Sequence, residues 1–158
     1  MALFLSTFVN KVDKKGRVSV PASFRAALSK ENFQGFIAFR SYKNHAVECC
    51  SYSRMERLSE SVDDLDVFSD AQEDLTATIF ADAQQLPFDG DGRIILPQNI
   101  LEHAQIKDKV SFVGRGSTFQ IWAPDVFEAV QEEARSRLKK EQTTLRLRQK
   151  SSSEGVSS

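Results

Sequence analysis

The chain has 158 residues, 41% of them hydrophobic, and a formal net charge of −1. This length suits one ordinary domain or two half-size modules, with enough apolar residues for a modest core. The apolar start at residues 1–5 has no basic residues before it, and Asn10 and Lys11 end the apolar stretch early. This pattern argues against a signal peptide or a membrane span. We therefore expect a cytoplasmic protein.

The two cysteines, Cys49 and Cys50, are adjacent in the sequence. A vicinal pair closes no useful loop and lacks the spaced partners of a zinc site, so we expect no disulfide framework and no metal. Their position predicts strand residues that are buried or half-buried.

The near-neutral total hides an uneven charge distribution. Residues 1–57 carry ten Lys or Arg against four acids, whereas residues 58–92 carry no Lys or Arg against ten acids. A basic end of this kind favours a nucleic-acid partner, although the total charge does not. Further cations follow in the tail, where a solvated helix face is a simpler interpretation than a second DNA site: Arg135, Arg137, Lys139, Lys140, Arg146, Arg148 and Lys150.

The first half reads as strand, turn, strand, helix and two more strands. Apolar and polar residues alternate up to Val12, turn formers follow, and Gly16 can take a positive φ. Pro21 is expected at the first position of the helix, where its missing N–H costs nothing. The expected elements are strands at 9–12 and 17–20, a helix at 22–28, and strands at 35–40 and 46–50.

Helices are expected between and after the two halves. The intervening segment predicts helices at 53–62 and about 69–83, and strands return at 109–113 and 118–122. Pro124 then opens a last helix with an apolar stripe, formed by Phe127, Val130, Ala134, Leu138 and Leu145.

An internal repeat organises the chain. The segment 13–21, DKKGRVSVP, returns as DGDGRIILP at 89–97, with Asp, Gly, Arg and Pro at identical spacing and a constant offset of 76. Later strands also correspond, after one small slip in the offset. Each half is therefore one small β-rich module.

A strand set this small cannot bury both of its faces alone, so the two modules should pair into one barrel-like β-core with helices outside it. The fold class is α+β, a pseudo-dimer within one chain. The expected boundaries are module 1 at 7–54, a helical linker at 55–82, module 2 at 83–126, a C-terminal helix at 127–148 and a disordered tail at 149–158.

The duplicated Asp-x-x-Gly-Arg motif, with a strand and a proline after each copy, resembles the MraZ family, each half being similar to AbrB-type modules. The resemblance implies a duplicated swapped-hairpin β-barrel and a homo-oligomeric ring. It also implies a nucleoid-associated regulator that binds double-stranded DNA at direct repeats before the bacterial division and cell-wall gene cluster. Its DNA-facing residues, carried over by position, would be Asp13, Lys14, Lys15, Arg17, Asp89 and Arg93.

The residue types in these loops fit such a role. An arginine on a turn can present a planar fork of donors to a guanine edge or a phosphate. Asp13 and Asp89 would instead accept backbone N–H groups or orient the neighbouring arginine. The second loop has Gly90 and Asp91 where the first has two lysines, so the first should carry more phosphate affinity.

Simpler interpretations of these residues remain open. Arg17 and Arg93 could be solvated turn charges or structural ion pairs, and Arg25 a helix-surface charge. The Asp89 loop resembles an EF-hand start, but its twelfth position is Ile100 rather than a carboxylate. His45 and His103 lie far apart in sequence, without the partners of a zinc or catalytic site.

We expect no enzyme, no cofactor and no small-molecule substrate. Two alternative functions stay open beside the regulator: an antitoxin-like module that binds DNA and a protein, and a structural protein that forms rings.

Overall fold

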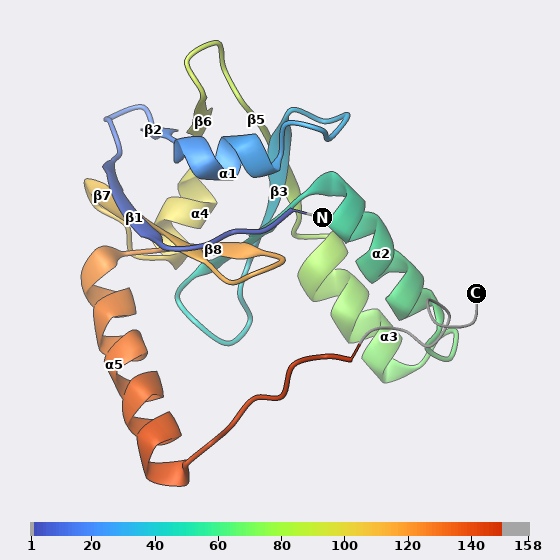
Figure 1. Ribbon diagram of the computed structural model, residues 1–158. Coiled ribbons are helices and arrows are strands. Elements are labelled where there is room, and N and C mark those ends of the chain that lie inside the picture. The colour runs from blue at the N-terminus through green and yellow to red at the C-terminus, as the bar shows by residue number, and fades with distance from the viewer. Residues whose placement is uncertain (1, 150–158) are drawn as a thin grey trace, which may run out of the picture. The chain divides into compact units, whose positions relative to one another are not determined.

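The fold was analysed in a computed structural model, which describes residues 2–149 (Figure 1). Its first half has the expected order of elements. They are β1 (Thr7–Lys11), β2 (Arg17–Ser19), α1 (Ala22–Ala27), β3 (Gly35–Arg40) and β4 (Val47–Cys50). Pro21 caps α1 from outside rather than serving as its first residue, with an extended ψ of 138°.

The second half repeats this order. Its elements are β5 (Gln84–Pro87), β6 (Arg93–Ile95), α4 (Gln98–His103), β7 (Lys109–Gly114) and β8 (Phe119–Trp122). Pro97 caps α4 as Pro21 caps α1. The sequence repeat is therefore also a repeat of secondary structure.

Three helical segments connect the halves: α2 (Tyr52–Asp63), α3 (Asp70–Leu75) and the π-helix η1 (Thr76–Phe80). Ser51 and Ser69 cap α2 and α3 by accepting backbone N–H groups. The expected single helix at 69–83 widens at Thr76, where Ala81 N–H donates to the Thr76 carbonyl. The Thr76 and Thr78 hydroxyls donate to carbonyls one turn back, which competes with regular α-helical geometry.

The two halves exchange strands. A six-stranded antiparallel sheet has the order β1-β7-β8-β4-β3-β5, and β2 pairs with β6 in a separate two-stranded ribbon. β1 therefore pairs with β7 of the other half, and β5 pairs with β3 of the first half. The α+β class with an antiparallel sheet is confirmed, and neither half forms its sheet alone.

One core joins both halves. Phe119 from β8 lies at its centre, with ring centroids 4.8 Å from Phe4, 4.9 Å from Phe24 and 4.9 Å from Phe36. All four rings are almost fully buried. Burying one such ring stabilises a protein by about 1.5–3 kcal/mol, so this cluster of rings from both halves stabilises the fold as a whole.

The last helix, α5, runs over Pro124–Glu141 and ends before the expected residue 148. Gln142 takes a left-handed φ of 52°, and Thr143 N–H donates back to the Leu138 carbonyl, a common way to close a helix. The expected apolar stripe was wrong at Leu145, which lies beyond the end of α5 and is 97% exposed, and Leu138 within the helix is 54% exposed.

The described part of the chain divides into two compact units, residues 2–127 and 128–149. Within the second unit, the α5 residues Arg135 and Arg137 pair with Glu132 and Glu133. These pairs agree with a solvated helix face. The disordered tail expected at 149–158 lies outside the described residues except for residue 149.

None of the helices within residues 2–149 combines the length and apolar composition that crossing a membrane requires.

Candidate nucleic-acid interface

Two turns with the same backbone geometry connect β1 to β2 and β5 to β6. In the first, Gly16 N–H donates to the Asp13 carbonyl and Asp13 N–H to the Arg17 carbonyl, each at 3.0 Å. Gly92, Asp89 and Arg93 repeat both bonds at 3.1 and 2.8 Å. The two glycines have φ values of 83° and 74°, a conformation that side chains with a Cβ rarely adopt.

The motif aspartates organise these turns. Asp13 Oδ1 accepts the backbone N–H groups of Lys15 and Arg17 at 2.9 Å each, and Asp13 Oδ2 accepts Arg17 Nε–H at 2.6 Å. Asp89 accepts the corresponding three bonds at 2.8, 2.9 and 3.0 Å. The prediction that each aspartate accepts backbone N–H groups and orients an arginine agrees with this geometry.

These bonds stabilise the charged carboxylates. The backbone N–H of Arg17 contributes most to lowering the pKa of Asp13, and that of Arg93 does the same for Asp89. Both aspartates are therefore ionised at neutral pH. Each ionised aspartate accepts from the Nε–H of its arginine, so this ion pair leaves the terminal nitrogens of the guanidinium unoccupied by the aspartate.

The two arginines differ in the number of N–H donors that remain free for a ligand. The side chain of Arg17 is 37% exposed and that of Arg93 is 33% exposed. Within residues 2–149, the two terminal nitrogens of Arg17 have no hydrogen-bond partner. A terminal nitrogen of Arg93 instead donates to Asp91 at 3.4 Å. Arg17 thus keeps four N–H donors for a ligand.

β2 and β6 lie side by side in the two-stranded ribbon (Figure 1), and their register brings both arginines onto one face. Arg17 pairs with Ile95 and Ser19 with Arg93 in the antiparallel register, so these four side chains share the outward face. Val18 and Ile94, between them, are 1% exposed and point into the core. The repeat predicted two loops; their placement on one ribbon follows from the pairing of the halves.

The charge at the two loops is unequal. The first combines Asp13 with Arg17 and two exposed lysines, Lys14 and Lys15, which form no ion pair within the described residues. The second combines one arginine with two acids, Asp89 and Asp91.

Each loop lies beside the short helix of the other half. Lys14 shares a pocket of about 420 Å³ with Leu101 and Glu102 of α4. A Cβ on Gly92 would lie 2.8 Å from the Arg25 side chain of α1, whose Nε–H donates to the Val20 carbonyl at 3.1 Å. Sequence reasoning left Arg25 as a surface charge, because the exchange of strands that places it beside the second loop is not visible in the motif.

The other candidate chemical groups lie elsewhere. His45 and His103, distant in sequence, come together with ring centroids 6.0 Å apart. His45 Nδ1 lies 3.2 Å from the His103 carbonyl oxygen, and His103 Nε2 lies 3.0 Å from that of Asn44. No group of three or more His, Cys, Asp or Glu side chains within residues 2–149 is placed to hold a metal ion.

Cys49 and Cys50 are buried, as their strand position predicted. Burial raises the pKa of the Cys49 thiol well above its usual range and that of Cys50 to about 12. Both are therefore protonated at neutral pH and poor nucleophiles.

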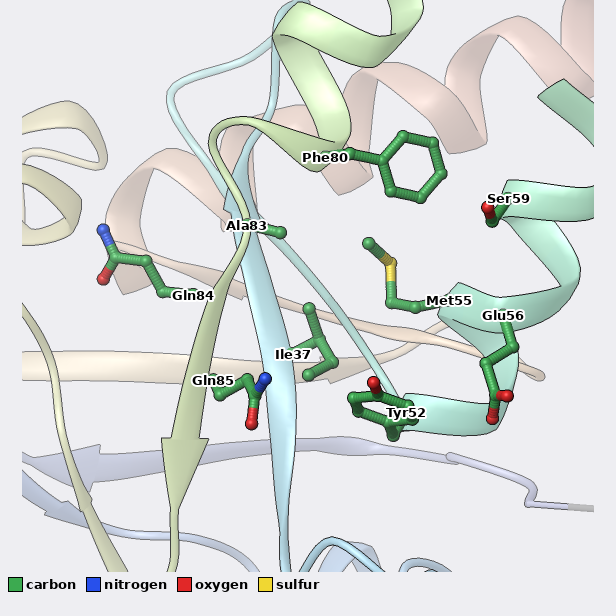
Figure 2. A pocket seen from close by; sticks show the side chains of 9 residues that line it. All are labelled: Ile37, Tyr52, Met55, Glu56, Ser59, Phe80, Ala83, Gln84 and Gln85. Carbon is green, nitrogen blue, oxygen red and sulfur yellow. The ribbon is translucent and has the colours of Figure 1, made fainter. Parts of the chain in front are cut away.

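A separate pocket of about 380 Å³ lies between α2, η1 and the edge of the sheet (Figure 2). Ile37, Met55 and Phe80 point toward one another and form its apolar part, and Glu56 lies at its rim. None of the six predicted DNA-facing residues lines this pocket.

Fold and site together define a class of protein: two interleaved α+β modules with one core and a ribbon that carries two aspartate-held arginines. The model of the MraZ protein family, whose description adds the words antitoxin-like, matches residues 79–149. A transcriptional regulator MraZ from Rickettsia akari (strain Hartford) is 46% identical over 146 residues, which cover 92% of this chain and 98% of that protein. One from Rickettsia bellii (strain OSU 85-389) is 45% identical over 147 residues, with the same coverage. The chain belongs to the MraZ family.

Proposed function

We propose that this protein is a sequence-specific, DNA-binding transcriptional regulator and that the outward face of the β2–β6 ribbon, with its two loops, contacts the duplex. The observation that carries the proposal is the pair of aspartate-held arginines on one exposed face. The relatives' name, transcriptional regulator, supports the same function.

The geometry suits the major groove of B-DNA, which is wide enough to admit a two-stranded β-ribbon. Asp13 holds Arg17 by its Nε and backbone N–H groups, which leaves the terminal nitrogens to form two bonds with guanine O6 and N7 or with a phosphate. Arg93 would do the same from the second loop. Preorganisation by the aspartates lowers the entropy lost on binding.

Lys14 and Lys15 would neutralise phosphates beside the groove. Each neutralised phosphate contributes about −0.9 to the slope of log K against log salt, so binding should be strongly salt-dependent. The acidic segment 58–92 would be repelled by phosphates. We place its helical part away from the duplex or against basic surface on a neighbouring subunit.

A single ribbon offers few contacts, so repetition would supply the affinity. A homo-oligomeric ring that presents several ribbons to repeated DNA boxes raises apparent affinity by roughly 10² to 10⁴ where the geometry permits. The exchange of β1 and β5 between the halves supports an AbrB-like swapped-hairpin barrel as the module that is repeated.

The finer biology follows from the family resemblance alone. It predicts direct repeats before the division and cell-wall gene cluster, a cytoplasmic, nucleoid-associated protein, and no enzymatic activity.

The test is DNA binding by the full chain. Duplexes selected by the wild type from a random library are used in fluorescence anisotropy, with size-exclusion light scattering to follow assembly. Arg17→Ala should weaken specific binding at least about fivefold, the lower end for loss of a bidentate base contact. Arg137→Ala on α5 is the matched control and should bind as the wild type does.

Equal binding by the wild type and Arg17→Ala, with unchanged assembly, would remove the proposed surface. Failure of the wild type to select any duplex would favour a structural ring. The antitoxin-like wording of the family description supports a second candidate, a module that also binds a protein. That function would appear as a stable hetero-complex formed without loss of DNA binding.

A further inference from the structure

The outward face of the β2–β6 ribbon is not the same in its two halves. At the offset of 76 residues, Arg17 corresponds to Arg93, and the buried Val18 corresponds to Ile94. Ser19, however, corresponds to Ile95. The pseudo-twofold symmetry of the ribbon is therefore broken at one outward-facing pair of positions.

Ile95 is an unusual residue for this face. Its side chain is 60% exposed, whereas its strand neighbours Ile94 and Leu96 are 1% and 2% exposed. The strand's inward positions already supply its contribution to the core. A branched apolar side chain that projects into water between two arginines contributes nothing to the fold that the described contacts reveal.

The register places Ile95 directly opposite Arg17, and Ser19 directly opposite Arg93. Side chains directly opposite each other have Cβ atoms about 4.5–5.5 Å apart. Neighbouring bases on one DNA strand are about 3.4 Å apart along the axis. The two side chains of each pair can thus reach the same base pair or adjacent ones.

We infer that Ile95 contacts the 5-methyl group of a thymine next to the guanine read by Arg17, and that this contact fixes the orientation in which a subunit reads its DNA box. This inference rests on the proposed function. The thymine methyl is the apolar group that the major groove offers, and an aliphatic side chain is its natural partner. Ser19, beside Arg93, offers a hydroxyl instead and makes no methyl contact.

The other differences between the two ends of the ribbon favour the end that carries Ile95. Arg17 follows the loop that carries Lys14 and Lys15, whereas Arg93 follows the loop that carries Asp91. One end therefore combines the available arginine, the lysines and Ile95. A symmetric ribbon would bind a box equally well in both orientations, whereas this one has a strong and a weak end.

The experiment compares the DNA selected by full-length wild type, Ile95→Ser and Ser19→Ile, with Val67→Ser as the control. Val67 is 73% exposed on the α2–α3 loop, so its substitution removes the same kind of side chain away from the ribbon. Each thymine of the selected box is then replaced by deoxyuridine, which lacks only the methyl group.

We expect one thymine at which deoxyuridine weakens wild-type binding about three- to fivefold, the factor that burial of one methyl group gives. Ile95→Ser should bind the duplex with thymine and the duplex with deoxyuridine at that position equally well, and Val67→Ser should behave as the wild type. Ser19→Ile should gain a thymine preference at the mirrored position, which makes the selected box more symmetric.

The inference is overturned if Arg17→Ala loses binding but no deoxyuridine position depends on residue 95. It is also overturned if Ser19→Ile leaves the selected box unchanged while Ile95→Ser still loses its thymine preference. Failure of the proposed function gives a different result, because then Arg17→Ala binds DNA as the wild type does.

Discussion

The two Asp-x-x-Gly-Arg loops have the same backbone and different surroundings. Both aspartates accept the same three hydrogen bonds, and both glycines have a positive φ. Gly16, however, faces the backbone of Leu96, whereas Gly92 faces the side chain of Arg25. The motif thus determines the shape of each loop. The variable loop residues determine its charge, and the neighbours from the other half determine how well its glycine tolerates substitution.

The largest difference is expected for glycine substitution. Gly16→Ala should lower the free energy of unfolding by about 2–4 kcal/mol, because a left-handed φ costs about 1–2 kcal/mol and the new Cβ would lie 2.7 Å from the Leu96 carbonyl oxygen. Gly92→Ala should cost only about 1–2 kcal/mol, because the flexible Arg25 side chain can move aside. Urea unfolding at one fixed protein concentration measures both values.

Arg25→Ala provides the control for that explanation. It should reduce the cost of Gly92→Ala only slightly, because the Arg25 side chain moves aside at little cost, and leave the cost of Gly16→Ala unchanged in a double-mutant cycle. Equal costs for the two glycine substitutions would contradict the contrast between backbone and side-chain neighbours.

The next difference concerns the arginines. Arg17→Ala should weaken DNA binding by about 1–3 kcal/mol and Arg93→Ala by less, because Asp91 shares the guanidinium of Arg93. Anisotropy titrations at one salt concentration, with assembly checked by light scattering, compare the two variants. A larger loss for Arg93→Ala would reverse our assignment of the strong end.

An exchange of loop charges sharpens this comparison without changing net charge. Lys15→Asp alone should make the slope of log K against log salt shallower by about 0.9, the value for one phosphate contact. Adding Asp91→Lys should restore the slope and make Arg93→Ala the more harmful arginine substitution. If the slope is the same in the wild type and Lys15→Asp, Lys15 makes no phosphate contact.

The smallest effect is expected in acid. Because the folded-state pKa values of Asp13 and Asp89 are lowered, their contribution to stability is present above an unfolded pKa of about 3.9 and is lost as pH falls through the lower folded values. Asp13→Asn and Asp89→Asn should each flatten the fall of the melting temperature below about pH 4. The control is Asp125→Asn at the exposed start of α5, and a variant curve parallel to the wild type would contradict the effect.

Much of the local structure could be predicted because it depends on neighbours in sequence. The strand at 35–40 was predicted with its observed bounds, and the five other strands for which the sequence predicted ranges differ by one or two residues at either end. The role of Asp13 within its turn was also predictable, since its partners lie within four residues. The interruption of the helix expected at 69–83 was not predicted. It begins at Thr76, where threonine hydroxyls compete for the backbone carbonyls of the preceding turn.

Sequence alone determined the duplication, the shape of the two turns and the charge that each carries, because short-range sterics and hydrogen bonds fix these features. Tertiary structure decided that β1 and β5 cross to the other half, which placed Arg25 beside Gly92 and His45 beside His103. It also decided that Ile95 lies opposite Arg17. Such pairings depend on burying one shared aromatic core, and the free energy of that burial belongs to the whole assembly of strands rather than to any segment.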